Sequence, residues 1–186
     1  KNVDFEKTLI LNVLLPEETI NSNNTCYNLD SNELIKSIKG DLLYLDPPYN
    51  SRQYCDAYHL LENVARWEKP EVYGVARKMD RTPLKSHYCM ITATKAFQEL
   101  IEKADTKYIM LSYNNMSNKG NGRSNAKISD GDILRILSKK GKVTIFESDY
   151  KIFSTGKSDI KNNKERLFLC EVYSEEKKKD EYTLSI

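Results

Sequence analysis

The sequence predicts an α/β fold with a mostly parallel sheet. Short apolar runs of strand length alternate with longer segments whose apolar residues recur every three to four positions, as on one face of a helix. This alternation is typical of parallel sheets, in which each strand is followed by a helix that leads to the next strand. A length of 186 residues suits one domain with a hydrophobic core.

The first expected elements meet at Asp30. Residues 25–28 predict a short strand, and a helix is expected from residue 30 or 31 to residue 38. Glu33 is placed to complete a cap at the start of this helix. Asp30 therefore lies at a switch from strand to helix.

The next strand ends at an unusual loop. Residues 42–45 form an apolar run that predicts a buried strand, and Asp46, Pro47, Pro48 and Tyr49 follow it directly. In open α/β sheets ligands bind outside the carboxyl ends of the strands. The two prolines fix φ and lack backbone donors, so they make the loop stiff and leave its carbonyls free to accept hydrogen bonds. An acid, a carbonyl and an aromatic ring are thus presented together.

Three further helices and four further strands continue the alternation. The helices cover residues 58–67, 89–104 and 129–140, with core faces at Leu60, Leu61, Val64, Ala65 and Trp67, at Ala93, Phe97, Leu100, Ile101 and Ala104, and at Ile133, Ile136 and Leu137. The strands cover residues 108–113, 142–147, 149–153 and 166–173. Residues 54–58 are expected to be a linker, and residues 69–86 and 114–128 to be loops.

Composition and cysteine spacing argue against metal and membrane proteins. The four cysteines form no CxxC pair, and neither His59 nor His87 lies in a ligand motif, so no metal site is expected. A reduced, cytoplasmic protein is the expected class. No apolar run is long enough to span a membrane, and no signal peptide is visible. The chain begins with Lys1 rather than Met, as expected of a fragment of a longer protein. Residues 1–24 are interpreted as the tail of an upstream element, such as a target-recognition region, and residues 174–186 as an exposed charged tail.

Asp46-Pro47-Pro48-Tyr49 resembles the DPPY signature of amino-group DNA methyltransferases, most of which act on adenine. Four residues could also form a purely structural turn, but the flanking sequence favours the family. Residues 50–54, 58–61, 108–115 and 166–172 resemble the corresponding segments of the Dam-like, D12-class adenine methyltransferases. The resemblance covers residues 25–173. It implies the carboxyl-terminal part of a Rossmann-like class I S-adenosylmethionine-dependent methyltransferase, with strands 142–147 and 149–153 as its terminal antiparallel hairpin.

The resemblance assigns roles to the residues of the DPPY motif and to those at the strand-to-helix switch near Asp30. Asp46 and the Pro47 carbonyl would accept the two hydrogens of the adenine amine, with Pro48 stiffening the loop and Tyr49 stacking on the base. S-adenosylmethionine would be the methyl donor, bound by Asn28, Asp30 and Asp46. An equally good interpretation is that Asp30 only caps its helix.

Double-stranded DNA is the partner that the resemblance implies. Residues 119–166 hold twelve Lys or Arg against six Asp or Glu, an excess that suits a polyanion. The expected DNA-binding residues are Arg52, Tyr54, Tyr58, His59, Asn114, Arg123, Lys151, Phe153 and Lys157. A solvated basic surface and, for Phe153, core packing are the alternatives.

The sequence departs from the family in two respects: the methyl-donor loop and the target-recognition region that precede the segment starting near Thr25 in the family are both missing. It contains no Phe-x-Gly-x-Gly methyl-donor loop, so the amino-terminal part of the fold is expected to be an absent segment or a second polypeptide. Adenine methylation within a restriction-modification system is the leading interpretation. The alternatives are a non-catalytic DNA-binding or subunit-interaction fragment, or amino-methylation of cytosine, RNA or protein. No motif identifies the recognition sequence.

Overall fold

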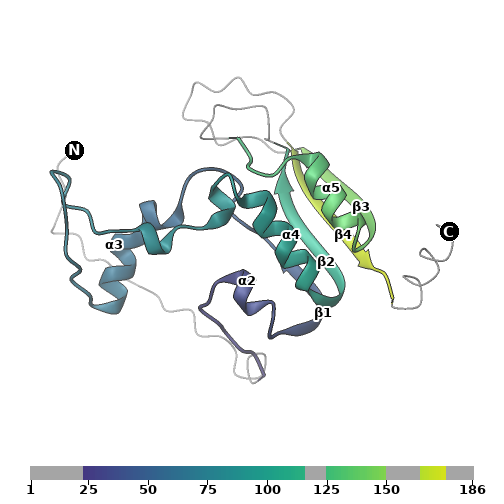
Figure 1. Cartoon of the computed structure of the whole chain (residues 1–186), viewed down its shortest axis with the longest axis horizontal. Coiled ribbons are helices and arrows are strands. Elements are labelled where there is room, and N and C mark those ends of the chain that lie inside the picture. Colours follow the sequence, from purple (N-terminus) through teal and green to yellow (C-terminus); the bar gives the residue numbers. More distant parts are fainter. Residues whose placement is uncertain (1–22, 116–124, 150–163, 175–186) are drawn as a thin grey trace.

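A four-stranded mixed sheet lies at the centre of the computed structural model, which describes residues 23–115, 125–149 and 164–174 (Figure 1). The strands are β1 (Lys39–Leu45), β2 (Asp105–Asn114), β3 (Gly141–Asp149) and β4 (Lys164–Val172), in the order β1-β2-β4-β3. β1 pairs with β2 in parallel, and β4 pairs antiparallel with both β2 and β3. β1, β2 and β3 therefore run in one direction and β4 in the other.

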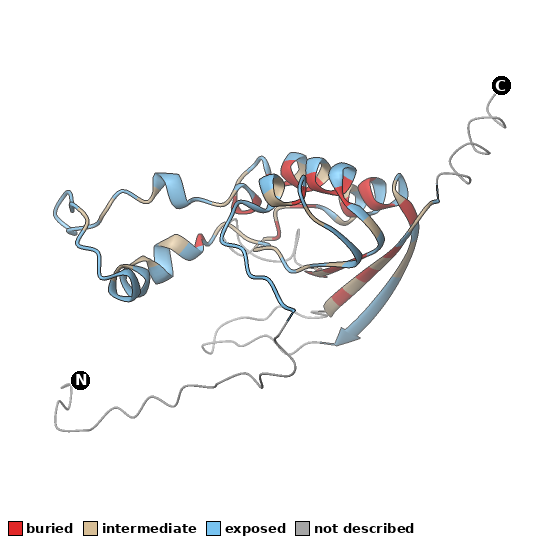
Figure 2. Ribbon diagram, turned by 90° about the horizontal axis from the view of Figure 1, so that it is seen from below, coloured by how far each residue is buried: buried red, intermediate tan, exposed pale blue. Residues whose placement is uncertain are grey.

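Two amphipathic helices cover one face of this sheet. They are α4 (Ala93–Lys103) and α5 (Asp130–Ser138), and Figure 2 shows both on the same side of the strands. Their buried residues pack on alternate residues of β2 and β4 to form the core, which includes Phe97, Leu100, Ile101, Ile133, Leu137, Ile109, Leu111, Phe168 and Cys170. The core faces predicted for these two helices are confirmed.

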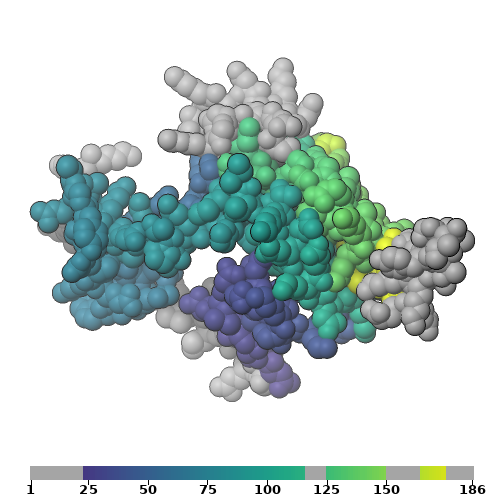
Figure 3. Space-filling view, in the orientation of Figure 1, coloured from purple at the N-terminus to yellow at the C-terminus, as the bar shows by residue number. Residues whose placement is uncertain are grey.

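Two helices lie outside this layer. The short α2 (Ser31–Leu34) is placed beside α4, and Figure 3 shows the purple residues of this segment against the teal residues of α4. α3 (Tyr54–Arg66) and the loop after it stand to one side of the sheet (Figure 1). Two 3-10 helices, Thr82–Leu84 and His87–Cys89, lead the chain back to α4.

The amino-terminal elements differ from the prediction. Residues 25–28 form no strand, because a strand needs a hydrogen-bonded neighbour and β1 pairs only with β2 among the described residues. The helix after Asp30 is one turn long and ends before residue 38. β1 is not buried as expected, since it is an edge strand and only one of its faces meets the core.

The prediction for α3 is wrong at its start and in its packing. The helix begins at Tyr54, so residues 54–58 are its first turns rather than a linker. Its apolar residues Leu60, Leu61 and Val64, expected in the core, are exposed. Helical periodicity identifies an amphipathic face, but it does not supply the surface against which that face packs.

The carboxyl-terminal strands also differ from the prediction. Residues 142–149 lie in one strand, β3, so no hairpin turn separates residue 147 from residue 149. The antiparallel partner of β3 is β4, which lies between β2 and β3. Gly141 permits this pairing, because a Cβ there would meet the Glu171 carbonyl oxygen at 2.1 Å. The rest of the predicted 149–153 strand, and most of residues 1–24 and 174–186, lie outside the described residues.

Candidate active site

The candidate site lies at the carboxyl ends of β1 and β2. These two strands are parallel, with Leu45 paired to Leu111, so their ends meet at one edge of the sheet. Asp46 follows β1 directly and is exposed. Its carboxylate makes no hydrogen bond or ion pair with the described residues. Pro47 and Pro48 are half-buried beside it, so the acid is held on a stiff loop and faces solvent.

Tyr113, near the end of β2, holds this loop in place. Its hydroxyl donates to the Tyr49 carbonyl at 3.3 Å and accepts from the Ile128 N–H at 3.1 Å. The Lys127 N–H donates to the same Tyr49 carbonyl at 2.7 Å. Burial raises the pKa of Tyr113 to about 12, so its hydroxyl remains a donor at neutral pH. The ring of Tyr49 meets that of Tyr113 edge to face, with 6.3 Å between centroids, and is 39% exposed.

Replacing Tyr113 by phenylalanine is expected to lower the free energy of unfolding by about 1–2 kcal/mol, because the Ile128 N–H loses its buried acceptor. The ring, and with it the core packing, is kept. Urea unfolding of the two proteins measures the difference. An unchanged midpoint at an unchanged slope would show that these hydrogen bonds do not hold the loop.

The residues after Tyr49 are anchored by Gln53, a buried residue that the sequence did not single out. Its side-chain amide exchanges two hydrogen bonds with the backbone of Ser86, at 2.8 and 3.1 Å. The Cys89 thiol donates to the Arg52 carbonyl at 3.5 Å. The loop that carries the acid is therefore tied to the segment that precedes α4.

Arg166, on β4, joins three elements at the same edge of the sheet. Its guanidinium donates to both oxygens of Asp130 at 2.7 and 2.8 Å, and to the Asn114 carbonyl at 2.7 Å. It also lies 5.1 Å from the centroid of the Phe168 ring. The side chain is 6% exposed. Arg166 thus fixes the end of β2 and the start of α5 relative to β4.

Glu165 adds a second carboxylate to the edge of the sheet that carries Asp46. Burial raises the pKa of Glu165 above its ordinary value, and the negative charge of Asp46 raises it further. Glu165 pairs with Asn114 at the end of β2, so both acids lie at the edge of the sheet where β1 and β2 end. Two carboxylates at this edge favour a bound group that is positively charged or donates hydrogen bonds.

The raised pKa of Glu165 predicts a pH dependence of stability. The folded protein binds this proton more tightly than the unfolded chain, so the stabilisation is fully present below the ordinary value of 4.5 and is lost as the pH rises through the raised pKa. The Glu165→Gln variant stays neutral, and its melting temperature should therefore rise relative to the original protein as the pH increases above 4.5 and through the raised pKa of Glu165. A difference between the two melting temperatures that does not vary with pH would contradict this.

Asn28 and Asp30 line a cavity at a different place from the loop that carries Asp46. Asp30 caps α2, accepting from the N–H groups of Asn32 and Glu33 at 2.9 and 3.2 Å. Both bonds use Oδ1, which leaves Oδ2 for another donor. The cavity, about 870 Å³, lies between α2, residues 83–88 and the start of α4, and Asp46 does not line it.

Eight of the nine residues expected to bind DNA fall into three groups. Arg52 and the α3 residues Tyr54 and Tyr58 are exposed, and the two tyrosine rings lie 6.0 Å apart. Asn114 is buried, with its carbonyl on Arg166. Arg123, Lys151, Phe153 and Lys157 lie outside the described residues.

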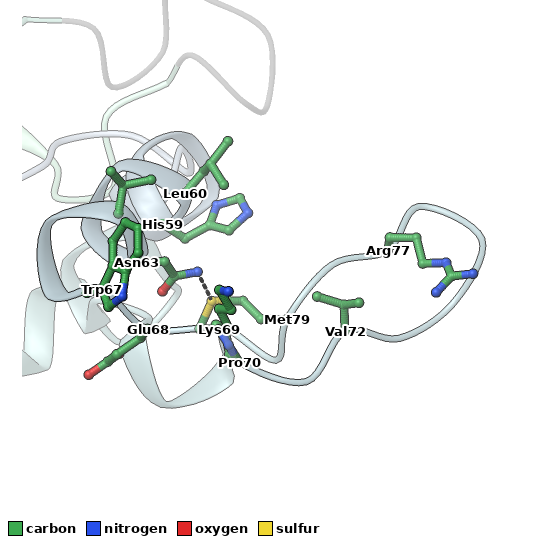
Figure 4. A pocket seen from close by; sticks show the side chains of 11 residues that line it. His59, Leu60, Asn63, Trp67, Glu68, Lys69, Pro70, Val72, Arg77 and Met79 are labelled. Atoms are coloured by element: carbon green, nitrogen blue, oxygen red, sulfur yellow. Dashed lines mark hydrogen bonds between the residues drawn. The ribbon is translucent and has the colours of Figure 1, made fainter.

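His59 is half-buried in a second cavity, about 340 Å³, between α3 and the loop that follows it (Figure 4). Trp67 and Met79 line the same cavity, and Asn63 donates to the Met79 sulfur at 3.2 Å. The Nδ1 atom of His59 is buried and has no hydrogen-bond partner among the residues that the structure describes. This cavity is separate from the loop that carries Asp46.

The part of the chain that the structure describes lacks both a metal-ligand cluster and a membrane-spanning helix. No group of three His, Cys, Asp or Glu side chains there could hold a metal ion. None of its helices is long and apolar enough to cross a membrane.

Several known proteins are similar to this chain. Residues 6–121 match the family described as D12 class N6 adenine-specific DNA methyltransferase. Modification methylase StsI of Streptococcus sanguinis is 38% identical over 168 residues, which are 87% of this chain and 24% of the relative. Type II methyltransferase M.NlaIII of Neisseria lactamica is 37% identical over 139 residues, or 74% of this chain and 38% of the relative. Type II methyltransferase M.FokI of Planomicrobium okeanokoites is 47% identical over 91 residues, which are 48% of this chain and 14% of the relative.

This chain therefore spans between about a seventh and two fifths of these relatives. No solved structure matches it.

Proposed function

The chain belongs to the D12 class of N6 adenine-specific DNA methyltransferases, and we propose that it is the catalytic part of an enzyme that methylates adenine in double-stranded DNA. The methyl group comes from S-adenosylmethionine and goes to the exocyclic amine. The observation that carries the proposal is the position of Asp46, an exposed acid at the end of a strand, on a loop clamped by Tyr113. Relatives named as modification methylases and type II methyltransferases support a role in a restriction-modification system.

The chemistry follows from the electronic structure of the adenine amine. The nitrogen lone pair is conjugated into the ring, which makes the amine a poor nucleophile. If the Asp46 carboxylate accepts one amino hydrogen and the Pro47 carbonyl the other, the nitrogen moves toward tetrahedral geometry and its lone pair points at the methyl group. Acceptors fixed in advance stabilise the positive charge that develops on nitrogen, and such preorganised electrostatics is usually the largest catalytic contribution.

The base must leave the DNA stack to reach this loop, which costs a few kcal/mol. Tyr49 supplies the compensating contact, because its ring is partly exposed and can stack on the base. Its backbone carbonyl accepts hydrogen bonds from the Tyr113 hydroxyl and the Lys127 N–H, which keep it in place. Pro48 keeps the ring and the acid in a fixed relation.

Tyr49→Ala is expected to lower kcat/KM by about 10- to 100-fold, since stacking contributes about 1–3 kcal/mol per base. Tyr49→Phe keeps the ring and the backbone carbonyl, so we expect a loss of less than about threefold. Methyl transfer to a fixed DNA substrate by the complete enzyme measures both. Equal losses in the two variants would assign the role to the hydroxyl group rather than to the ring.

The methyl donor is expected to bind between Asn28 and Asp30 on one side and Asp46 on the other. The free Oδ2 of Asp30 and the cavity beside it suit the amine of the donor's adenine. We propose that these residues form half of a donor site in a Rossmann-like class I fold. An amino-terminal segment or a second polypeptide with the glycine loop supplies the other half.

DNA is expected to lie along the edge of the sheet that carries Asp46. Arg52, Tyr54, Tyr58 and His59 follow the motif, and Asn114 ends the neighbouring strand. Further DNA contacts are expected from Arg123, Lys151, Phe153 and Lys157. The expected location of the enzyme is the cytoplasm.

A non-catalytic DNA-binding or subunit-interaction fragment is the second candidate, favoured by the absence of a Phe-x-Gly-x-Gly sequence. Calorimetric titration with S-adenosylhomocysteine distinguishes the two, first with this chain and then with the polypeptide encoded immediately upstream added. The catalytic proposal expects binding in at least the second titration. An absence of binding in both would favour the non-catalytic fragment. Methylation of cytosine, RNA or protein is less well supported, because the matched family is adenine-specific.

A further inference from the structure

A chain of hydrogen bonds joins the loop of the DPPY motif to helix α2. It begins at Gln53, whose side-chain amide exchanges two hydrogen bonds with the backbone of Ser86. The Ser86 hydroxyl accepts from the Tyr88 N–H at 3.2 Å. The Tyr88 hydroxyl then donates to Oδ1 of Asn32, in α2, at 3.0 Å. The chain therefore connects the two places between which the methyl donor is expected to bind.

Tyr88 is the central member of this chain. Its side chain is 8% exposed and belongs to the hydrophobic core, together with Ala96 and Phe97 of α4. Burial raises the pKa of Tyr88 to about 12, so its hydroxyl remains a donor at neutral pH. The residue lies in the 3-10 helix His87–Cys89, which is capped by Ser86. Tyr88 is thus a fixed donor to which α2 is attached.

Helix α2 depends on contacts of this kind for its orientation. It is one turn long, and none of its residues is buried. A helix this short is not stable by itself in water, so tertiary contacts must hold it. Asn32 makes two of them, since its Oδ1 accepts from Tyr88 and its Nδ2 donates to the Ala96 carbonyl at 2.8 Å. Ile35, directly after the helix, packs in the core. The orientation of α2 therefore depends on Asn32.

Asp30, the cap of α2, is the group that this arrangement orients. Its Oδ1 accepts from the N–H groups of Asn32 and Glu33, so any rotation of α2 moves the whole carboxylate. The cavity proposed to receive the adenine of the donor is lined by Asp30, Asn32, Ser86 and Tyr88, among others. Small displacements matter at such a site, since a misplacement of about 1 Å can cost about 100-fold in rate.

We propose that Tyr88 is a positioning residue for the methyl donor: through Asn32 it holds the Asp30 carboxylate in a fixed place relative to the loop that carries Asp46. The inference rests on the proposed function, and it names a residue on which the geometry of the donor site depends. Tyr88 acts on the donor through Asp30 rather than by contact with the donor's amine. Removal of its hydroxyl should therefore weaken recognition of that amine specifically.

Tyr88→Phe is the test, made in the complete enzyme that contains this chain, because it keeps the buried ring and removes only the hydroxyl. Calorimetry measures the Kd of S-adenosylhomocysteine and the Kd of its analogue that lacks the 6-amino group of the adenine. The Kd of S-adenosylhomocysteine should rise about tenfold, since the amine loses its hydrogen bond to the Asp30 carboxylate. The Kd of the analogue should change by less than about twofold, because this ligand has no amine to lose.

Tyr73→Phe is the matched control. Tyr73 is 60% exposed on the loop after α3, and its hydroxyl donates to Glu71, so the Kd of both ligands should be unchanged. Asn32→Ala breaks the same link from its other end and should also raise the Kd of S-adenosylhomocysteine alone. The double variant of Tyr88 and Asn32 should lose no more affinity than the weaker-binding single variant, since both substitutions interrupt one chain.

The outcomes separate the inference from the proposed function. An unchanged Kd of S-adenosylhomocysteine in both variants would overturn the inference. Equal losses for the two ligands would overturn it as well, because a merely structural role predicts that both bind less tightly. Equal binding of the two ligands by the original enzyme would show that Asp30 does not recognise the amine, and the inference would fail with that assignment. An original enzyme that binds neither ligand would contradict the proposed function itself.

Discussion

Asp46→Asn and Asp46→Ala are expected to abolish methyl transfer, with a loss of at least about 10³-fold in kcat, while the fold remains intact. The carboxylate makes no bond with the described residues, so its removal leaves no buried group without a partner. The loop itself is held through the Tyr49 carbonyl, which the substitution does not touch. Tritium transfer to DNA by the complete enzyme measures the loss, and urea unfolding checks stability.

Asp41→Ala is the matched control for this experiment. Asp41 is an exposed carboxylate on the same strand, and it pairs with Lys107 at the surface, away from the loop. Its removal should change activity by less than about twofold, since exposed ion pairs contribute little. Substantial turnover by a well-folded Asp46 variant would contradict the role assigned to this acid.

Arg166→Met is expected to lower the free energy of unfolding by about 2–4 kcal/mol. The substitution removes a buried cation that binds both oxygens of Asp130 and the Asn114 carbonyl. Loss of one partner of a buried pair costs about 3–5 kcal/mol, and the partial exposure of Asp130 places this case toward the lower end. Urea unfolding measures the change.

Arg135→Met is the control for Arg166. Arg135 pairs with Asp132 at a similar distance, but Arg135 is exposed and Asp132 is only half-buried, so the expected loss is below about 0.5 kcal/mol. Similar losses in the two variants would mean that burial of Arg166 does not determine its contribution. The same pair of variants shows whether the edge of the sheet needs this network, because only Arg166 contacts the end of β2.

The sequence predicts the elements that have complete partners within this chain. α4 and α5 bury the residues that their periodicity indicates, because the sheet face that they need is present. α3 has the same kind of amphipathic pattern and yet exposes Leu60, Leu61 and Val64. Periodicity reports the presence of an apolar face and carries no information about the surface that covers it. The strand at residues 42–45 was misjudged in the same way, since one of its faces lacks a cover.

Prediction of the candidate site also succeeded for some residues and failed for others. The loop from Asp46 to Tyr49 was predicted because the acid, the prolines and the aromatic residue are adjacent in sequence. Tyr113, Gln53 and Arg166 were missed as positioning residues because their hydrogen-bond partners lie 15 to 64 positions away in the sequence, so no local pattern marks them. The position of β4 between β2 and β3 was missed for a similar reason, since pairing of distant strands depends on tertiary packing.

The most direct test of the central claim is the identity of the methylated nucleoside. The complete enzyme that contains this chain is incubated with labelled S-adenosylmethionine and unmethylated genomic DNA. The DNA is then digested to nucleosides, which are separated. The account predicts label in N6-methyldeoxyadenosine, and none when Asp46→Asn replaces the original chain. Label in methylcytosine, or no label from an enzyme that binds S-adenosylhomocysteine, would contradict it.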